Sequence, residues 1–393
     1  MKHTDRARRT VCRLLILALL IGILTGCGGA GKTPWADVAS TVLLPETGET
    51  DAEFEKETEG SDVKEPKTKV SAKVMQETYE KLKTPYKYGA VMKLEDQLCD
   101  SPSVFFHDGT WYMSFIQIDR NTASSGYESY LAKSDDLLRW EVLFPIFERT
   151  EDDFWDARQR AAYAAFVEND LAGGFALQKV NEKYYFSYLG GNLNGYETDP
   201  LQMGELRVAD LLDPATYERF EEPILSPFDA DSRPGERKTL FKSDLFIDEA
   251  ETLGHRYVNV YNAKDSDDVE TVFLAVSDDG EHWTRYLDHA VFSEPGSQIT
   301  GDPIILRDGD LYIMVYFVLK DGVTYNTFAA SYDLVNWTRW KGKPLIESEY
   351  EWENVYAHKA SLVRRDGVLY HFYCAVNRQG ERFIAVAASE QVW

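Results

Sequence analysis

The chain has 393 residues and a formal net charge of −24 at pH 7, with 66 acidic and 42 basic side chains. Such an excess of carboxylates repels nucleic acid and anionic membrane surfaces, so the composition excludes both as electrostatic partners. Hydrophobic residues make up 44% and aromatic residues 13% of the sequence. This is sufficient for a large core and suits an all-β domain that binds planar or sugar-like ligands.

The first 26 residues have the layout of a secretory signal. Basic residues come first, and an apolar run from Leu14 to Leu24 follows, which is too short to span a bilayer comfortably. The stretch Leu24-Thr-Gly-Cys27 resembles the bacterial lipobox, which implies cleavage before Cys27 and acylation of its sulfur. We therefore expect an extracytoplasmic protein that is held at a membrane by a lipid anchor only. An ordinary signal peptide or an uncleaved anchor is the alternative.

Residues 27–72 predict an acidic, flexible tether. They are rich in Glu, Thr, Gly, Lys and Pro and carry few large apolar side chains, so they cannot bury enough surface to fold by themselves. The reach of such a segment grows as the square root of its length. Removal of residues 1–26, which carry five basic residues and one acid, changes the net charge from −24 to −28. Residues 73–393 remain as the folded body.

A β-hairpin pattern recurs along the folded body. Each copy has an apolar stretch of strand character, a turn that is often Asp-Gly, and an alternating second strand. In chain order, the pattern predicts hairpins at residues 99–113, 173–186, 242–261, 301–317 and 358–373, of which the second is the weakest. The residues at the equivalent starts are Asp100, Asp244, Asp302 and Lys359, and the weakest copy has Glu168 and Asp170 just upstream.

A second repeated signal supports the same count. Three of the hairpins are followed by a strand that ends in a small polar turn and a tryptophan, at residues 132–140, 275–283 and 330–337. Trp283 and Trp337 are 54 residues apart. A period of this size with about four strands per unit is typical of a β-propeller blade, because each blade buries its faces only against its neighbours. The sequence therefore predicts an all-β fold, a five-bladed β-propeller over residues 73–393.

Three segments lie outside this repeat. Residues 154–163 predict a short helix on the rim, or alternatively a pocket mouth lined by Trp155, Arg158 and Arg160. The turn-rich residues 190–195 and 226–236 are loops of the kind that carry specificity on a rigid scaffold.

Two cysteines of the folded body, Cys99 and Cys374, fall in the first and last blades, which meet when a propeller closes. A disulfide there is conceivable in an oxidising compartment, and two buried free thiols are at least as consistent with the sequence.

Acids at equivalent starts of inner strands should converge on the propeller axis. Asp100, Asp244 and Asp302 hold such positions. Carboxylates gathered in a partly dehydrated channel have pKa values that diverge, which allows one to act as acid and another as base. Two carboxyl groups across a glycosidic bond are the minimum for its hydrolysis. Alternatively, each Asp caps a turn or binds backbone N–H groups at a strand start.

The hairpins, the Asp-led strand starts and the tryptophan-ended blades resemble glycoside hydrolases of family 43 and their relatives in families 32, 68, 117 and 130, over about residues 95–390. The resemblance implies an acidic triad on the inner strands. In family 43 this triad is a general-base Asp on blade one, a pKa-modulating Asp on blade two and a general-acid Glu on blade three. Asp100 matches the first position, Glu168 or Asp170 stands near the second, and Asp244 stands at the third. We expect Asp100 as base, with Asp244 and Asp302 sharing the other two roles in undecided order.

The resemblance has two further implications. Some family-43 enzymes bind calcium in the axis, so calcium can be accommodated although no cofactor is required. In family-117 relatives a histidine protonates the leaving group, which makes His358 a reserve acid. Lys359 and Tyr356 could grip a sugar hydroxyl or acid, and Glu353 is a further candidate by position. Alternatively these residues of the last blade are structural, with Lys359 neutralising the acids around the axis.

The predicted function is therefore a glycoside hydrolase that acts on poly- or oligosaccharides, with the oligomeric state left open. One alternative is a phosphorylase resembling family 130, which needs a basic cluster for phosphate; the candidates are His358, Lys359, Arg364, Arg365, Arg378 and Arg382. The other is a surface glycan-binding lipoprotein without turnover. The sequence has no Gly-rich phosphate loop, zinc-type Cys/His spacing or Gly-x-Ser-x-Gly elbow, so nucleotide, zinc and serine-hydrolase chemistry have no support.

Overall fold

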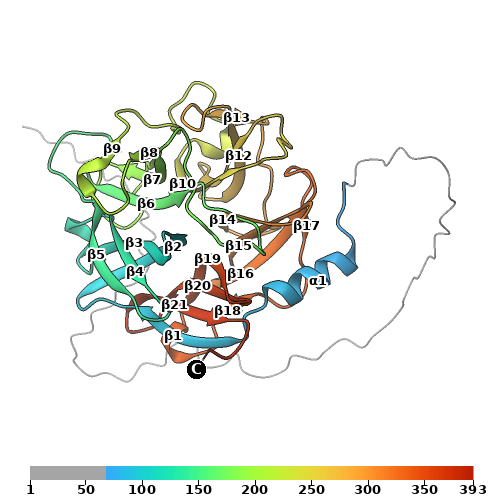
Figure 1. Ribbon diagram of the computed structural model, residues 1–393. Helices are drawn as coiled ribbons and strands as arrows, with labels where there is room; N and C mark the ends of the chain where they lie inside the picture. The colour runs from blue at the N-terminus through green and yellow to red at the C-terminus, as the bar shows by residue number, and fades with distance from the viewer. Residues whose placement is uncertain (1–67, 393) are drawn as a thin grey trace, which may run out of the picture. The chain divides into compact units, whose positions relative to one another are not determined.

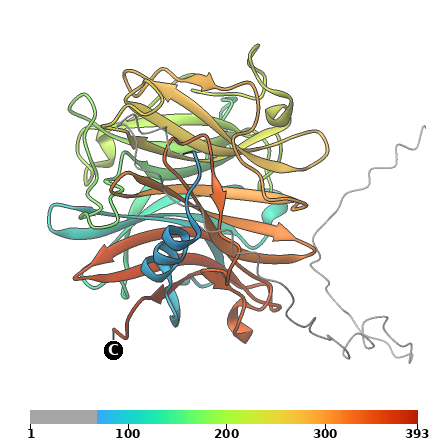
Figure 2. The same cartoon turned by 90° about the vertical axis from the view of Figure 1, so that its right-hand side faces the viewer.

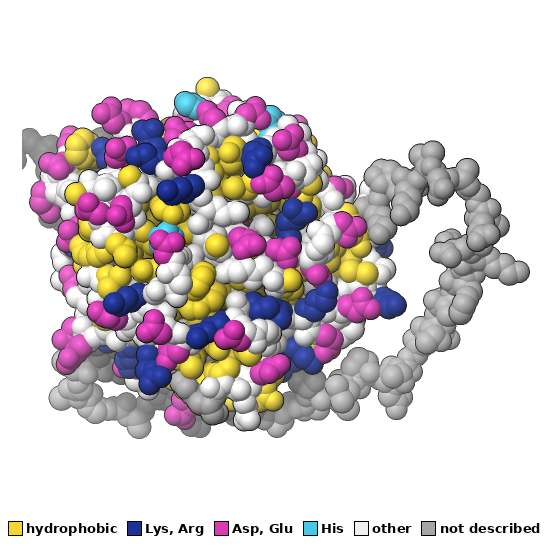
Figure 3. Space-filling view, in the orientation of Figure 1, with side chains coloured by type: hydrophobic (Ala, Val, Ile, Leu, Met, Phe, Trp, Pro, Cys, Tyr) yellow, Lys and Arg dark blue, Asp and Glu magenta, His cyan; other side chains and the backbone are white. Residues whose placement is uncertain are grey.

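The structure is a computed structural model that describes residues 68–392. The predicted signal, Cys27 and most of the predicted tether lie outside the described residues. Within residues 68–392, no helix is long and apolar enough to cross a membrane. On the face drawn in Figure 3, acidic and basic side chains are interspersed, so negative charge is not gathered into one patch there.

Five antiparallel blades, two of which are joined into one nine-stranded sheet, surround a central axis, which confirms the predicted propeller (Figure 1). The strands of blade one are β2 (Gln97–His107), β3 (Thr110–Asp119), β4 (Glu128–Ser134) and β5 (Glu141–Phe147). Those of blade two are β6 (Gln159–Ala165), β7 (Tyr184–Gly191), β8 (Gln202–Val208) and β9 (Tyr217–Arg219). Those of blade three are β10 (Thr239–Ile247), β11 (Tyr257–Lys264), β12 (Glu270–Ser277) and β13 (Thr284–Tyr286).

Blades four and five complete the ring. The strands of blade four are β14 (Ile299–Asp308), β15 (Leu311–Lys320), β16 (Val323–Ser331), β17 (Thr338–Arg339) and β18 (Ile346–Glu347). Those of blade five are β19 (Tyr356–Arg365), β20 (Val368–Val376), β21 (Arg382–Ala388) and β1 (Tyr86–Met92). The single helix α1 (Ala72–Leu82) and four short 3₁₀ turns, at Thr122–Ser124, Pro214–Thr216, Pro234–Glu236 and Glu351–Glu353, are the other elements of the described chain.

The ring is closed by pairing the two ends of the folded body. β1 is the outermost strand of blade five and pairs antiparallel with β21, from Tyr86 opposite Ala388 to Met92 opposite Ile384. The first strand in sequence therefore completes the last blade (Figure 1). Blades three and four are also linked, by one parallel bridge between Glu270 and Ile299.

Helix α1 packs on the outer side of blades four and five (Figure 2). Ser71 caps its first turn by accepting from Val74 N at 3.3 Å. Tyr79 stacks on Trp340 with ring centroids 4.9 Å apart. These contacts anchor the start of the described chain to the propeller.

The inner strands are interrupted by β-bulges close to their starts. The pairing register shifts between Asp100 and Ser103 in β2, between Leu240 and Ser243 in β10, between Gly301 and Ile304 in β14, and between His358 and Ala360 in β19. Ser101, Asp302 and Lys359 have positive φ angles of 46°, 47° and 60°. Bulges of this kind re-aim side chains, and here they do so on four of the five strands that line the axis.

Blade two corrects the sequence analysis. Its inner hairpin is β6 with β7, and not residues 173–186, so Glu168 and Asp170 lie in the connection between these strands and not at an inner strand start. The helix predicted over residues 154–163 is also wrong, because β6 begins at Gln159. The strand is alanine-rich and six of its seven residues are buried. A strand that is buried on both faces shows no alternation and is hard to recognise.

Cys99 and Cys374 are both buried and carry free thiols. They do lie where the first and last blades meet, and the Cys374 thiol is 4.0 Å from the carbonyl oxygen of Cys99. The alternative of two free thiols therefore holds.

Candidate active site

The site is built at the mouth of the axial channel, where the inner strands begin, and the Asp100 carboxylate is at its base. Asp100 is fully buried. It accepts hydrogen bonds from Arg382 Nη1 (2.6 Å), Tyr196 Oη (2.6 Å), Ser101 N (2.7 Å) and Lys359 Nζ (3.4 Å). Although burial opposes ionisation, Arg382 and Lys359 hold the pKa of Asp100 well below its usual value. Asp100 is therefore a permanent anion that fixes two cations from blade five.

A loop from blade two extends over this base. Lys359 Nζ donates to Glu197 Oε1 at 2.7 Å, and the Glu197 side chain remains 27% exposed. The loop between β7 and β8 is fixed by Gln159, whose Nε2 donates to two loop carbonyls at 2.8 Å each. Glu197 has a positive φ of 49°, which is strained for a residue with a side chain. The loop thus places Tyr196 and Glu197 beside the strand residues of blades one and five.

Two further carboxyl groups meet where blade three adjoins blade four. Asn262 Nδ2 donates to Glu270 Oε2 at 2.8 Å, and Asn262 Oδ1 accepts from Asp302 N at 3.1 Å. Asn262 is fully buried, whereas Glu270 and Asp302 are 8% and 6% exposed. One amide side chain therefore holds both acids at the channel mouth.

These two acids have raised pKa values. Burial, together with the nearby Glu197 and Asp302 carboxylates, raises the pKa of Glu270 to about 8. Burial also raises the pKa of Asp302 to about 6, against the opposing effect of the Lys359 and Lys242 ammonium groups. At pH 7, Glu270 therefore keeps its proton while Asp100 is ionised. The environment has separated the carboxyl groups into a proton donor and an anion.

Lys242 forms the floor of this cluster. It is buried, its ammonium lies 5.4 Å from the Tyr163 ring centroid, and it donates a long hydrogen bond of 3.5 Å to the carbonyl of Ala360 across the channel. Burial lowers the pKa of Lys242, whereas Asp302 and Asp244 raise it. Its charge therefore acts on both Asp302 and Asp244, whose pKa values it lowers.

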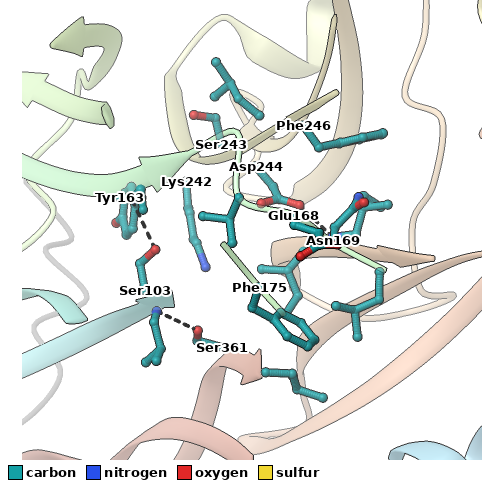
Figure 4. Close-up of a pocket in the computed structure, with 18 residues that line it drawn as sticks. Ser103, Tyr163, Glu168, Asn169, Phe175, Lys242, Ser243, Asp244, Phe246 and Ser361 are labelled. Carbon is teal, nitrogen blue, oxygen red and sulfur yellow. Dashed lines mark hydrogen bonds between the residues drawn. The ribbon is translucent and has the colours of Figure 1, made fainter. Parts of the chain in front are cut away.

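Asp244 faces a different space from the other predicted acids. It lines a small cavity of about 60 Å³ deeper along the axis, with Lys242, Glu168 and Tyr163 among its walls (Figure 4). Its Oδ2 accepts from Ile305 N at 2.6 Å, and burial raises its pKa to about 6. Asp100 and Asp302 do not line this cavity, so the three acids do not face one cavity as predicted.

His358 is buried below the mouth. Its Nδ1 lies 3.2 Å from the Cys374 carbonyl oxygen, and its ring packs edge-on against Phe317 at 5.2 Å and beside the half-buried Tyr356 at 5.4 Å. Burial and the neighbouring Arg382 lower the pKa of His358 to about 3. A ring that is neutral at pH 7 is not in the acidic imidazolium form that a general acid requires, which does not support the reserve-acid prediction.

The predicted binding residues of blade two have structural contacts on the rim. Trp155 stacks on Tyr188 at 5.6 Å, and its Nε1 donates to Glu221 O at 2.9 Å. Arg158 bonds the Thr150 carbonyl and pairs with Glu151, while Arg160 is buried against Asp156 at 3.3 Å. None of the contacts of these residues involves the carboxylate cluster.

Glu353 is also structural. It is fully buried and accepts from Lys87 Nζ at 2.7 Å, from Tyr373 Oη at 2.7 Å and from Glu349 N at 3.0 Å. These bonds close the 3₁₀ turn Glu351–Glu353 against β1 and β20.

The basic cluster that a phosphorylase would need is not assembled. Arg364 and Arg365 bond carbonyl oxygens at exposed turns, at Gly367 and Asp135, and Arg378 is exposed. Lys359 and Arg382 do reach the site, but both are bound to carboxylates there.

The residues that surround the axis do not fit a calcium ion. Among residues 68–392 there is no group of three or more His, Cys, Asp and Glu side chains that could hold a metal. The axial cavity instead contains the ammonium group of Lys242, which would repel a cation.

Sequence analysis missed Glu197, Glu270 and Asn262, and it named Arg382 only as a candidate phosphate ligand. One signal was available for Glu270, because it is an acid at the start of the apolar strand Glu270–Ser277. Glu197 follows the turn-rich residues 190–195, which were expected to form a specificity loop.

Comparisons with known proteins agree with this geometry. No family model and no curated protein matches the sequence. A solved structure described as a glycoside hydrolase is 36% identical, with a TM-score of 0.78, and the match covers 82% of this chain and 97% of that one. The structure of BT0996 in a complex with RGII is 37% identical, with the same TM-score of 0.78 and the same coverage of 82% and 97%.

More distant structures share the fold. A family 117 glycoside hydrolase from the marine bacterium Zobellia galactanivorans has a TM-score of 0.58 at 13% identity, over 79% of this chain and 91% of that one. A thermostable family-43 glycoside hydrolase has a TM-score of 0.53 at 15% identity, over 74% and 89%. The resemblance to propeller glycosidases is thus confirmed. On the strength of the glycoside hydrolase structure that is 36% identical over 82% of the chain, this protein belongs to the glycoside hydrolases.

Proposed function

We propose that this glycosidase cleaves its substrate between Glu270, acting as general acid, and Glu197, acting as base or nucleophile. The observation that carries the proposal is that a buried, protonated carboxyl group and a solvent-accessible carboxylate share the mouth of the channel. Family 43 would place the base on Asp100. In this protein that carboxylate accepts hydrogen bonds from the side chains of Arg382, Tyr196 and Lys359 and from Ser101, so its role is to hold Lys359 and Arg382.

The surroundings of Glu270 suit proton donation. With a pKa of about 8 the carboxyl group is protonated at pH 7, near the value at which general acids work best. Asn262 donates to Oε2, which leaves Oε1 to carry the proton. Departure of the leaving group would then convert Glu270 to a carboxylate that Lys359 and Lys264 partly compensate.

Glu197 supplies the second carboxyl group. Its pairing with Lys359 at 2.7 Å orients one oxygen, and its exposure leaves the side chain accessible to a sugar or a water. Asp302 lies close enough to influence Glu270 and is itself influenced by Glu197. We assign Asp302 the modulating role, in which it controls the charge felt by the two reacting groups.

The substrate proposal rests on the similarity to BT0996, which was solved in a complex with RGII and is 37% identical. We propose that this protein also acts on an oligosaccharide of the RGII type. A polymer of this kind is met outside the cytoplasm, which agrees with the signal and lipid anchor proposed for residues 1–27. Cys27→Ser should release the protein from membranes into the soluble fraction; equal membrane retention of both forms would contradict acylation at this residue.

The test is turnover of RGII-derived oligosaccharides and a panel of aryl glycosides, with and without phosphate. Glu270→Gln and Glu197→Gln should each lose about 10² to 10⁴ in kcat, while the matched surface variant Glu249→Gln should retain it. Full turnover by both site variants would place the chemistry elsewhere. A requirement for phosphate would support the phosphorylase, and sugar binding without any turnover would indicate a glycan-binding protein.

A further inference from the structure

A second hollow lies on the outer side of the molecule between blades two and three. Its volume is about 750 Å³. Its walls come from the end of β8 and the turn after β9 on one side, and from the turn between β12 and β13 on the other. Glu270 begins β12, whereas the groove residues Glu281 and Trp283 follow the end of that strand. The groove is therefore separated from the catalytic mouth by the length of a strand.

The groove occurs where the blade repeat is broken. In blades one and four, the tryptophan of the repeated turn closes its own turn: Trp140 and Trp337 donate to the carbonyl three residues back, at 3.2 and 2.9 Å. In blade three, Trp283 instead donates to Glu205 Oε1 of blade two, at 2.8 Å. The Trp283 ring is thus fixed between two blades, and it lines the groove.

Glu205 is an unusual support for an aromatic ring. It is fully buried, and burial raises its pKa well above the usual value, which favours the neutral carboxylic acid. Its second oxygen, Oε2, has no hydrogen-bond partner in the described chain. An unsatisfied buried polar atom destabilises a fold by about 1–3 kcal/mol. The presence of this destabilising group in the fold is explained if the orientation that Glu205 gives to Trp283 is needed for function.

The other walls combine aromatic rings with planar polar groups. The Arg207 guanidinium lies 4.7 Å from the Phe220 ring centroid and 3.6 Å from Glu281 Oε1. Arg219 lies 4.7 Å from the centroid of Phe154, a side chain that is 47% exposed beside the groove. Donors, acceptors and aromatic faces are therefore all presented to one hollow.

We propose that this groove is a second carbohydrate-binding site, which takes neutral sugar units of a polysaccharide. Its volume is within the range of small-molecule sites, about 300–1,000 Å³. The C–H face of a sugar ring packs on aromatic side chains, while its hydroxyl groups pair with guanidinium and carboxylate groups. Four glutamates and two arginines line the groove, so its net charge is negative and uronate-rich chains are repelled.

The location assigns the site a role distinct from catalysis. A sugar in the groove cannot also lie between Glu197 and Glu270 at the other end of the strands. The groove therefore retains the enzyme on a polymer, and its occupation should alter the apparent affinity for polymeric substrate without altering turnover of a small glycoside. This inference goes beyond the proposed catalytic function and does not depend on it.

The test measures binding of the full-length protein to neutral arabinan and galactan, with polygalacturonate as the acidic comparison, by affinity electrophoresis and calorimetry. Trp283→Phe and Arg207→Ala should each weaken binding to a neutral polymer by about tenfold or more, a loss of about 1.4 kcal/mol. Trp140→Phe, the equivalent position of blade one, is the matched control and should bind as the wild type. Turnover of a small aryl glycoside should stay within about twofold in all three variants.

Several results would overturn the proposal. These are unchanged binding in Trp283→Phe and Arg207→Ala, an equal loss in Trp140→Phe, binding of polygalacturonate alone, or binding of neither neutral polymer. The last result would mean that the groove does not bind neutral polysaccharide. Binding measured in the Glu270→Gln background separates this outcome from failure of the catalytic proposal, because a catalytically silent protein still reports on the groove.

Discussion

Replacement of Glu270 by Gln should abolish turnover and also stabilise the fold at alkaline pH. The glutamine preserves the shape of the side chain and an oxygen that can accept from Asn262, as Glu270 Oε2 does at 2.8 Å. The glutamine amide has no acidic proton to transfer to a leaving group, and it stays neutral over the whole pH range. A positioned general acid contributes about 10²- to 10⁴-fold to the rate, so kcat should fall by that factor.

The expected stability change follows from the pKa of Glu270, which burial raises from 4.5 to about 8. Between these values the unfolded chain has lost this proton and the folded chain has kept it. The free energy of unfolding of the wild type therefore falls by about 1.4 kcal/mol for each pH unit as pH rises through this window. The glutamine of Glu270→Gln does not titrate, so the variant should gain about 4 kcal/mol over the wild type between pH 5 and pH 8.

The assay is urea unfolding followed by tryptophan fluorescence at pH 5 and pH 8, with turnover measured on the same samples. Glu249→Gln is the control, because Glu249 is an exposed partner of Arg256 at 2.7 Å and should show no such gain. Parallel pH dependence in Glu270→Gln and the wild type would refute the reasoning. It would mean that Glu270 is ionised in the folded protein and has no proton to transfer.

Three further outcomes are expected. Asp100→Asn should lower the free energy of unfolding by about 3–5 kcal/mol, because it leaves the buried Arg382 without its carboxylate partner and Lys359 with Glu197 alone; an unchanged urea midpoint would contradict this. Lys359→Met should move the acidic limb of the kcat/KM profile to higher pH, because the ammonium lowers the pKa of Asp302; an unmoved limb would exclude this role. A reductant should leave Tm unchanged, since Cys99 and Cys374 are free; a reductant-dependent fall in Tm would reveal a disulfide.

The propeller could be predicted because its signals are local. The Asp-Gly turns and the alternation of apolar and polar residues both lie within the short sequence of a single hairpin. Four of the five hairpins lie where they were expected. Blade two could not be found in this way. Its inner strand, β6, is buried on both faces and uses small side chains, so neither period nor composition distinguishes it from a helix.

The site was predicted in part, because register is not visible in a sequence. Asp100 is the last residue before the bulge of β2, Asp302 lies within the bulge of β14, and Asp244 follows the bulge of β10. Because each acid has a different position relative to its bulge, side chains that look equivalent in the sequence lie at different places along the axis. Glu197 and Glu270 come from a loop and from the third strand of a blade, so only the assembled ring brings them together.

The pairing of β1 with β21 also sets an order of events during synthesis. Tyr86 is made 302 residues before its partner Ala388, so β1 waits for the rest of blade five until translation is nearly complete. Closing a loop of that length costs about 5 kcal/mol of chain entropy, which the other blade contacts must offset. Until then β1 has no strand to pair with. If β1 is missing, β21 presents an open edge, and open edges pair with other chains. Shortened forms that begin after residue 92 should therefore aggregate, even though every residue of the catalytic cluster would still be present.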